Sequence, residues 1–147
     1  GGCTHPLMAA VFAFGKRGAN NRAPVSNYLI SKGFDFDGVK VGFDTTAMML
    51  RRLDRDVPNG TNIAILQPGG NDLLFFGTRK QRAANIAEMA RRLRATAIDV
   101  IVYDDDIPLR YYTIDFIHLT REGHATIAAA LLPRVMAIVN RRGRNKP

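Results

Sequence analysis

The stretch IAILQPGGND, residues 63–72, indicates how this chain folds. Its first four residues, Ile63–Leu66, form a continuous apolar run, which is typical of a strand buried on both faces of a sheet. Pro68, Gly69 and Gly70 then end the strand, because proline and glycine are strong turn residues. The stretch therefore predicts an interior strand whose carboxyl end leads into a turn with polar residues.

Apolar runs and amphipathic stretches alternate along the rest of the chain. This alternation favours βαβ units, and hence an α/β fold in which a parallel sheet is covered by helices on both faces. Gln81 stands three residues after Thr78 and completes a capping box, and the helix that follows has an apolar stripe of Ile86, Met89, Ala90 and Leu93. Pro133 is expected to kink or interrupt the last helix. Further strands are expected over 8–14, 39–41 and 98–103, helices over 25–32 and from Asp44-Thr45-Thr46, Thr78 and Thr120, and a loop over 104–117.

Length and composition indicate one globular domain over residues 1–147. The hydrophobic content is 46%, and no apolar run approaches the ~20 residues of a membrane span. Because Cys3 is the only cysteine, no intrachain disulfide can form. No ligand cluster has the spacing of a zinc site, so neither a metal nor a cofactor is expected.

The net charge of +8 arises in part from a basic tail at about 140–147. Its four cations, Arg141, Arg142, Arg144 and Lys146, have no acidic neighbour. We interpret the tail as a solvated, frayed terminus, with contact to nucleic acid or anionic lipid as the alternative. No aromatic residue interleaves with these cations, so no specific nucleic-acid partner is expected.

Three polar groups could carry chemistry. His118 is a candidate general base, and Asp115, three residues earlier, could orient its imidazole. Asn71 follows two glycines and could donate its amide to an oxyanion. A surface or helix-cap pair and an ordinary turn are the alternatives for these two motifs. The run Asp104–Asp106 could hold a hard cation, but a solvated loop is the preferred interpretation.

Three segments in order resemble conserved blocks of the SGNH (GDSL-type) serine esterases and lipases. They are the Asp44-Thr45-Thr46 helix start, the strand and turn of residues 65–72, and the segment Asp115–His124, DFIHLTREGH. The chain is most similar to the arylesterase, thioesterase and lysophospholipase branch. The resemblance implies a three-layer α/β/α sandwich like flavodoxin, hydrolysis of small carboxylic esters or thioesters, and a periplasmic or secreted location, with a cytoplasmic one as the alternative. It assigns His118 as base, Asp115 as its orienter, and Asn71 and Gly42 as oxyanion donors.

The chain departs from that family at two places. Phe43 stands where the family has the glycine before Asp-Thr-Thr, so Gly42 is one residue further back. The turn after the first strand, residues 15–18, reads Gly-Lys-Arg-Gly and has no serine. Ser26 and Ser31 fall in the expected helix 25–32, and Cys3 precedes the first strand. A degenerate relative that binds without catalysing is therefore the alternative function.

Overall fold

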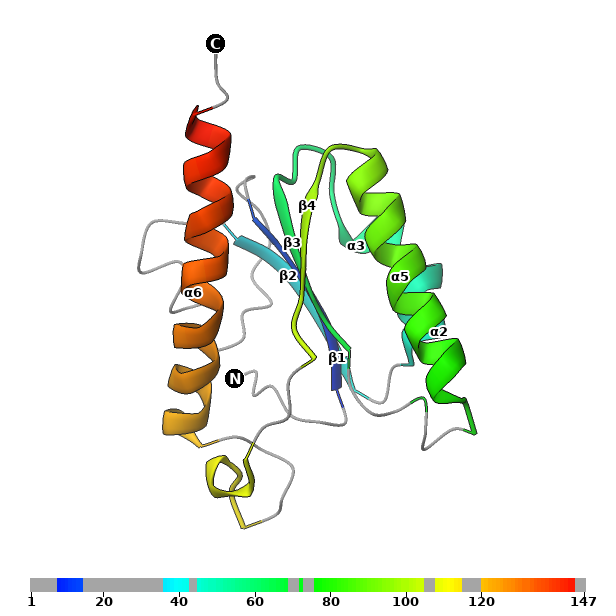
Figure 1. Cartoon of the computed structure of the whole chain (residues 1–147). Helices are drawn as coiled ribbons and strands as arrows, with labels where there is room; N and C mark the ends of the chain where they lie inside the picture. The colour runs from blue at the N-terminus through cyan, green and yellow to red at the C-terminus, as the bar shows by residue number, and fades with distance from the viewer. Residues whose placement is uncertain are drawn as a thin grey trace.

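The computed structural model describes residues 8–14, 36–42, 45–68, 72, 76–104, 108–114 and 120–144, and for the first two ranges it describes the backbone. The chain is mixed α/β, as predicted, and β1, β3, α5 and α6 begin within one residue of the expected positions. The predicted helix over Val25–Lys32 lies outside the described residues. The elements in chain order are β1 (Met8–Phe14), β2 (Phe36–Gly42), α2 (Thr46–Arg51), α3 (Leu53–Asp56), β3 (Ile63–Gln67), α5 (Arg79–Ala95), β4 (Asp99–Val102), the 3₁₀ turn η1 (Leu109–Tyr111) and α6 (Arg121–Arg144) (Figure 1).

The four described strands form one sheet in the order β2-β1-β3-β4. β3 and β4 are parallel, with Ile63 opposite Asp99 and Leu66 opposite Val102. β1 runs antiparallel to both of its neighbours, so the prediction of a parallel sheet is wrong at this strand. A continuous apolar run such as Met8–Phe14 shows that a strand is buried, but it does not encode the direction in which the strand runs.

Helices cover both faces of the described sheet (Figure 1). Side chains alternate along β3, so that Ile63 and Ile65 pack against α6 while Ala64 and Leu66 face α2, α3 and α5. This alternation divides the core into two clusters. The α6 side contains Ile63, Ile65, Ile101, Tyr103, Ile127, Ala128, Leu131 and Val135, and the other side contains Met49, Leu53, Val57, Ala64, Leu66, Met89 and Leu93.

α5 begins with the capping box that the sequence predicts. The Thr78 hydroxyl accepts from the Gln81 amide at 3.0 Å, and the Gln81 side chain accepts from the Thr78 amide at 3.0 Å. The expected apolar stripe is also present, with Met89, Ala90 and Leu93 buried against the sheet. Local sequence therefore determines both where α5 starts and which face it buries.

α6 begins after Thr120, as predicted, but it runs through Pro133 without interruption. Proline removes the donor for the carbonyl four residues earlier. Pro133 and Ala129 are both on the exposed side of the helix, where water can bond to that carbonyl. By length and composition α6 could cross a membrane, as core helices of soluble domains also can, and a third of its most apolar window is buried.

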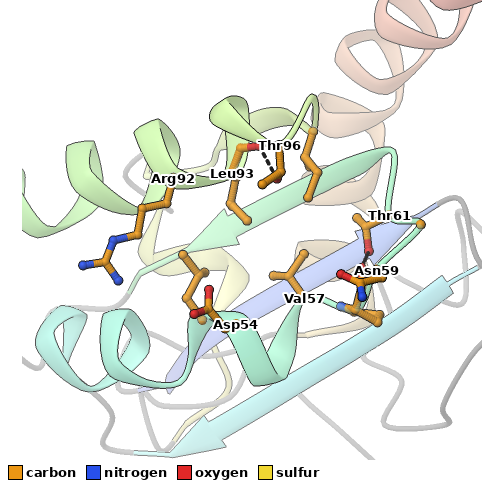
Figure 2. Close-up of a pocket in the computed structure, with 11 residues that line it drawn as sticks. Asp54, Val57, Asn59, Thr61, Arg92, Leu93 and Thr96 are labelled. Carbon is orange, nitrogen blue, oxygen red and sulfur yellow. Dashed lines mark hydrogen bonds between the residues drawn. The ribbon is translucent and has the colours of Figure 1, made fainter.

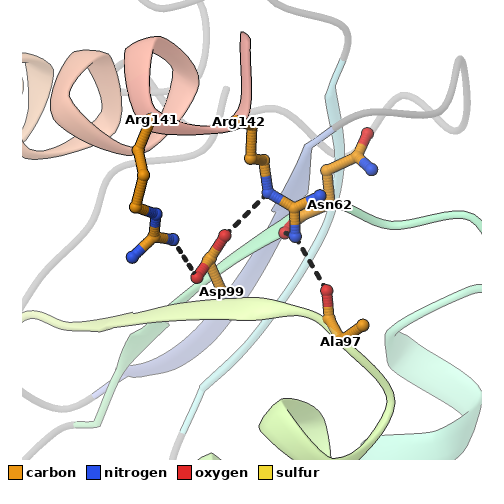
Figure 3. Close-up of polar contacts among 5 residues, drawn as sticks. All are labelled: Asn62, Ala97, Asp99, Arg141 and Arg142. Atoms are coloured by element: carbon orange, nitrogen blue, oxygen red, sulfur yellow. Dashed lines mark hydrogen bonds and ion pairs between the residues drawn. The ribbon is translucent and has the colours of Figure 1, made fainter. Parts of the chain in front are cut away.

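The first part of the basic tail is docked on the sheet, so Arg141 and Arg142 are not frayed as expected. Arg141 and Arg142 both donate to the carboxylate of Asp99, at the start of β4 (Figure 3). Burial raises the pKa of Asp99, but the bonds from the two guanidinium groups outweigh burial and hold this pKa below its usual value. The sequence did not reveal this partner because it lies more than 40 positions away along the chain.

Arg142 also holds the two loops that lead into the parallel strands. Its guanidinium donates to the carbonyl oxygens of Asn62, at 2.9 Å, and Ala97, at 2.7 Å (Figure 3). Ala97 has a φ of 62°, and its amide bonds the carbonyl of Arg94 at the end of α5. The last turn of α6 is thereby joined to the end of α5. Residues 145–147 lie outside the described residues.

Candidate functional site

The carboxyl ends of β2, β3 and β4 lie at the same edge of the sheet. Gly42 and Gln67, the last residues of β2 and β3, pair with Met8 and Ala10 of β1. β4 ends at Val102, opposite Leu66. α2, α5 and α6 all begin toward this edge, which is the lower edge in Figure 1. We call it the carboxyl edge, and ligands of open α/β sheets bind in this position.

Asp72 is a buried carboxylate at the carboxyl edge, 5% exposed. Its Oδ1 accepts from the backbone amide of Thr46 at 2.9 Å, and its Oδ2 accepts from the Thr46 hydroxyl. The amide of Asn85, on α5, donates to the same hydroxyl oxygen at 3.1 Å. Thr46 is the first residue of α2, where backbone amides have no partner within the helix. Asp72 therefore ties the turn after β3 to the start of α2.

Gly77 closes the loop that follows Asp72. Its amide donates to the carbonyl oxygen of Asp72 at 2.6 Å. A Cβ at position 77 would lie 2.8 Å from that oxygen, which is closer than a real Cβ approaches a backbone atom. A glycine is thus required at position 77 because the backbone passes so close to Asp72.

Arg82 and Asp104 form a second link at the carboxyl edge, between α5 and the residue just beyond β4. Both carboxylate oxygens of Asp104 accept from the guanidinium, at 2.6 and 2.8 Å. The bonds to Asp104 raise the pKa of Arg82. Asp104 is engaged in an ion pair, and no group of three or more metal-binding side chains occurs within the described parts of the chain. Asp105 and Asp106 lie outside them.

Thr120 anchors the start of α6. Its hydroxyl accepts from the amide of Gly123 at 3.0 Å, in the manner of an N-cap, and its own amide donates to the carbonyl of Tyr111 at 2.8 Å. This bond holds Thr120 beside Tyr111. Asp115 and His118 belong to the segment between them in the sequence and lie outside the described residues.

Of the four predicted site residues, the structure describes only Gly42, at the end of β2. Asn71 lies outside the described residues, but Asp72, its neighbour in the sequence, lies at the carboxyl edge. Gly42 is at the same edge through its pairing with Met8. The candidate nucleophiles, Cys3, Ser26 and Ser31, are also undescribed.

Sequence reasoning missed several polar residues near this edge. Asp72, Thr46 and Asn85 form the network above, although only the first two stood in segments selected by motif. Gln67 is 6% exposed, and its Oε1 accepts no hydrogen bond from the described residues. Gln67 is two residues after Ile65 and four after Ile63, so its side chain lies on the same face of β3 as theirs, toward α6. This spacing is the signal in the sequence that could have placed it. His124 lies in the first turn of α6, one turn before Ile127 on the side that faces the core, and it is therefore buried.

A pocket of about 230 Å³ lies at the opposite edge, between α3, the loop before β3 and the end of α5 (Figure 2). Its hydroxyl groups are already used, since Thr61 donates to the Pro58 carbonyl at 2.7 Å and Thr96 to the Leu93 carbonyl at 2.9 Å. Arg92 pairs with Glu88. This pocket is separate from the carboxyl edge and holds none of the predicted site residues.

Comparison with known proteins identifies no relative: no family model, curated protein or solved structure matches the chain. The functional argument therefore rests on the residues of this chain.

Proposed function

We propose that the chain is an SGNH-type hydrolase of small carboxylic esters or thioesters, with a flavodoxin-like three-layer α/β/α sandwich. One observation supports this most directly. The bonds from Thr46 to Asp72 join two segments that resemble successive blocks of that family, at the edge where such a site belongs. The strand order β2-β1-β3-β4 also agrees with the 2-1-3-4 part of the flavodoxin order.

In this proposal His118 removes a proton from the nucleophile as it attacks the acyl carbonyl carbon. Asp115 bonds the other ring nitrogen and stabilises the imidazolium. The Asn71 amide and the Gly42 backbone amide hold the oxyanion. When the intermediate collapses, the leaving alkoxide or thiolate takes the proton from His118. Water, deprotonated by His118, then releases the acid and restores the nucleophile.

Asp72 is a positioning residue in this scheme. Its buried carboxylate connects the turn that carries Asn71 to the start of α2, two residues beyond Asp44. An oxyanion donor acts best when it is held in place before the reaction. We therefore expect Asp72 to act through Asn71.

The direction of β1 bears on the nucleophile. β1 ends at Phe14 opposite Ile63, at the edge away from Gln67, and it begins at Met8 beside Gly42. The family resemblance would place a serine directly after β1, and here β1 ends at the edge opposite the carboxyl edge. Cys3 lies five residues before Met8 in the sequence. This direction favours Cys3 over residues 15–18, and a thiolate can serve as an acyl acceptor.

The test is turnover of an activated aryl ester and an acyl thioester, with labelling by a fluorophosphonate and by iodoacetamide. We expect turnover that falls at least about a hundredfold in His118→Ala and Asp115→Asn, whose folding is checked by circular dichroism. Peptide mapping identifies the labelled residue. If Cys3 is the nucleophile, Cys3→Ala should abolish labelling and turnover, whereas Ser26→Ala should not. Unchanged turnover in His118→Ala would contradict the proposal.

The second candidate function is a catalytically degenerate relative that binds acyl-bearing ligands. The observation that favours it is again β1, whose carboxyl end lies at the opposite edge and is followed by Gly-Lys-Arg-Gly without a serine. This candidate predicts no turnover and no covalent adduct, together with measurable binding of a non-hydrolysable acyl analogue. Turnover that depends on His118 would exclude it.

A further inference from the structure

After its first turn, which contains Glu122, the outer face of α6 lacks acidic residues and carries both apolar and basic side chains. No Asp or Glu occurs from Gly123 to the last residue of the sequence. From Ala129 onward the exposed residues of the helix are Ala129, Ala130, Pro133, Met136, Ala137, Asn140 and Gly143, together with Arg134, Arg141 and Arg144, and we call this set the α6 outer face.

Within the described part of the chain, only one side of α6 packs against other residues. Ile127, Leu131 and Val135 point into the core, whereas Met136 is 38% exposed. Only a third of the most apolar window of the helix is buried. Figure 1 shows α6 as the outermost element on its side of the sheet. The helix therefore presents an apolar surface that the described part of the chain does not cover.

The charges on this face are only partly neutralised. Arg141 shares Asp99 with Arg142 and remains 52% exposed. Among the described residues, Arg134 makes a long bond, 3.4 Å, to the Val102 carbonyl. Arg144 makes no ion pair within the described residues. Arginine binds phosphate in a two-pronged geometry and is weakly hydrated, so these side chains suit a surface of phosphate groups.

We propose that the α6 outer face docks this chain on an anionic phospholipid bilayer. A helix that lies in the plane of the interface buries an apolar side at the headgroup boundary and places cations among anionic headgroups. α6 meets both conditions without leaving the core, because its inner side stays on the sheet. The occupant is a bilayer and not nucleic acid because phosphate contacts alone would leave the apolar strip of Ala130, Met136 and Ala137 exposed to water.

The test is co-sedimentation of the whole chain with vesicles of phosphatidylcholine, with and without an equal part of phosphatidylglycerol. We expect binding to the anionic vesicles that weakens steeply as the salt rises from about 50 to about 500 mM, since screening shortens the reach of the charges. The double variant Arg134→Glu/Arg144→Glu should lose at least about tenfold in affinity. Met136→Glu should also weaken binding, because it places a charge in the apolar strip.

The matched control is Arg79→Glu/Arg121→Glu, which makes the same change of charge with exposed arginines at the carboxyl edge. Its vesicle affinity should stay within about twofold, and thermal unfolding checks that every variant folds. Equal loss in the control, equal binding to uncharged vesicles, or no binding would overturn the proposal. Two other results would also overturn it. One is a dimer, seen by sedimentation velocity, that Met136→Glu abolishes; the other is tighter binding to a labelled DNA duplex than to the vesicles.

Discussion

Two carboxylates hold distant parts of this chain together, Asp72 at the carboxyl edge and Asp99 at the opposite edge. Asp72 is buried, and its partners are a backbone amide and a hydroxyl of Thr46. Asp99 is 27% exposed in its side chain and is bonded by two arginines. A buried polar group that loses its partner cannot form a replacement hydrogen bond with water, whereas a partly exposed group can. We therefore expect the hydrogen bonds between Asp72 and Thr46 to contribute more to the free energy of unfolding than the ion pairs of Asp99.

The largest expected effect is that of Asp72→Ala. It leaves the amide and hydroxyl of Thr46 buried without their acceptor, and we expect a loss of about 2–4 kcal/mol in the free energy of unfolding. Urea denaturation measures it. Asp104→Ala removes an exposed partner of Arg82 and serves as the control, with an expected loss of about 1 kcal/mol or less. Equal losses in the two variants would remove the distinction between buried and exposed links.

Gly77→Ala tests the same region through the backbone. The new Cβ would press on the carbonyl oxygen of Asp72, and we expect a loss of about 1–3 kcal/mol. Gly143→Ala is the matched control, because a Cβ at position 143 would have no neighbour within 4 Å. Gly143 also lies inside α6, where alanine favours the helix more than glycine does. The control should be neutral or stabilising by up to about 1 kcal/mol. Urea midpoints for the two variants should therefore move in opposite directions.

Asp99→Asn tests the exposed link and should cost about 1 kcal/mol or less at neutral pH. Its pKa is lower in the folded chain than in the unfolded chain, so ionised Asp99 stabilises the fold. This contribution is complete above the unfolded pKa of about 4 and is lost as the pH falls through the folded value. The stability gap between wild type and Asp99→Asn should therefore close on acidification below about pH 4. A gap that persists there would show that charge is not its cause.

The smallest effect is expected at Glu88, on the exposed side of α5. Hydrogen bonds from Arg91 and Arg92 lower its pKa to about 2. Because Glu88 and both arginines are partly exposed to water, Glu88→Gln should leave the thermal midpoint unchanged within error. An NMR titration of the Glu88 carboxyl reports the pKa directly. A value near the ordinary one would mean that the two arginines do not hold their positions in solution.

The sequence predicted best those elements whose signals are local. The Thr78–Gln81 capping box and the apolar stripe of α5 involve neighbouring residues, and both are present. The start of α6 after Thr120 depends on a hydroxyl only three residues from its donor. The direction of β1 was not predictable in this way, because a continuous apolar run is equally compatible with either orientation.

The residues of the candidate site likewise fall into those selected by a local motif and those paired with distant parts of the chain. Turn chemistry and spacing selected the segments of Asn71 and Asp115–His118, whose roles stay predictions. The Asp72–Thr46–Asn85 network joins residues 26 and 39 positions apart, and no local pattern reports such a pairing. The docking of Arg142 on Ala97 and Asn62 was missed for the same reason.

The position of β1 has a consequence for the order in which the molecule assembles. β1 lies between β2 and β3, and its bond partners reach from Ala10 to Gln67 along the chain. Pairings between residues so far apart close slowly, whereas β3, α5 and β4 follow one another directly. We therefore expect the β3–α5–β4 unit to form first and β1 to arrive late. Until it does, β3 has an unpaired edge, and that interval is when another chain could add to the sheet.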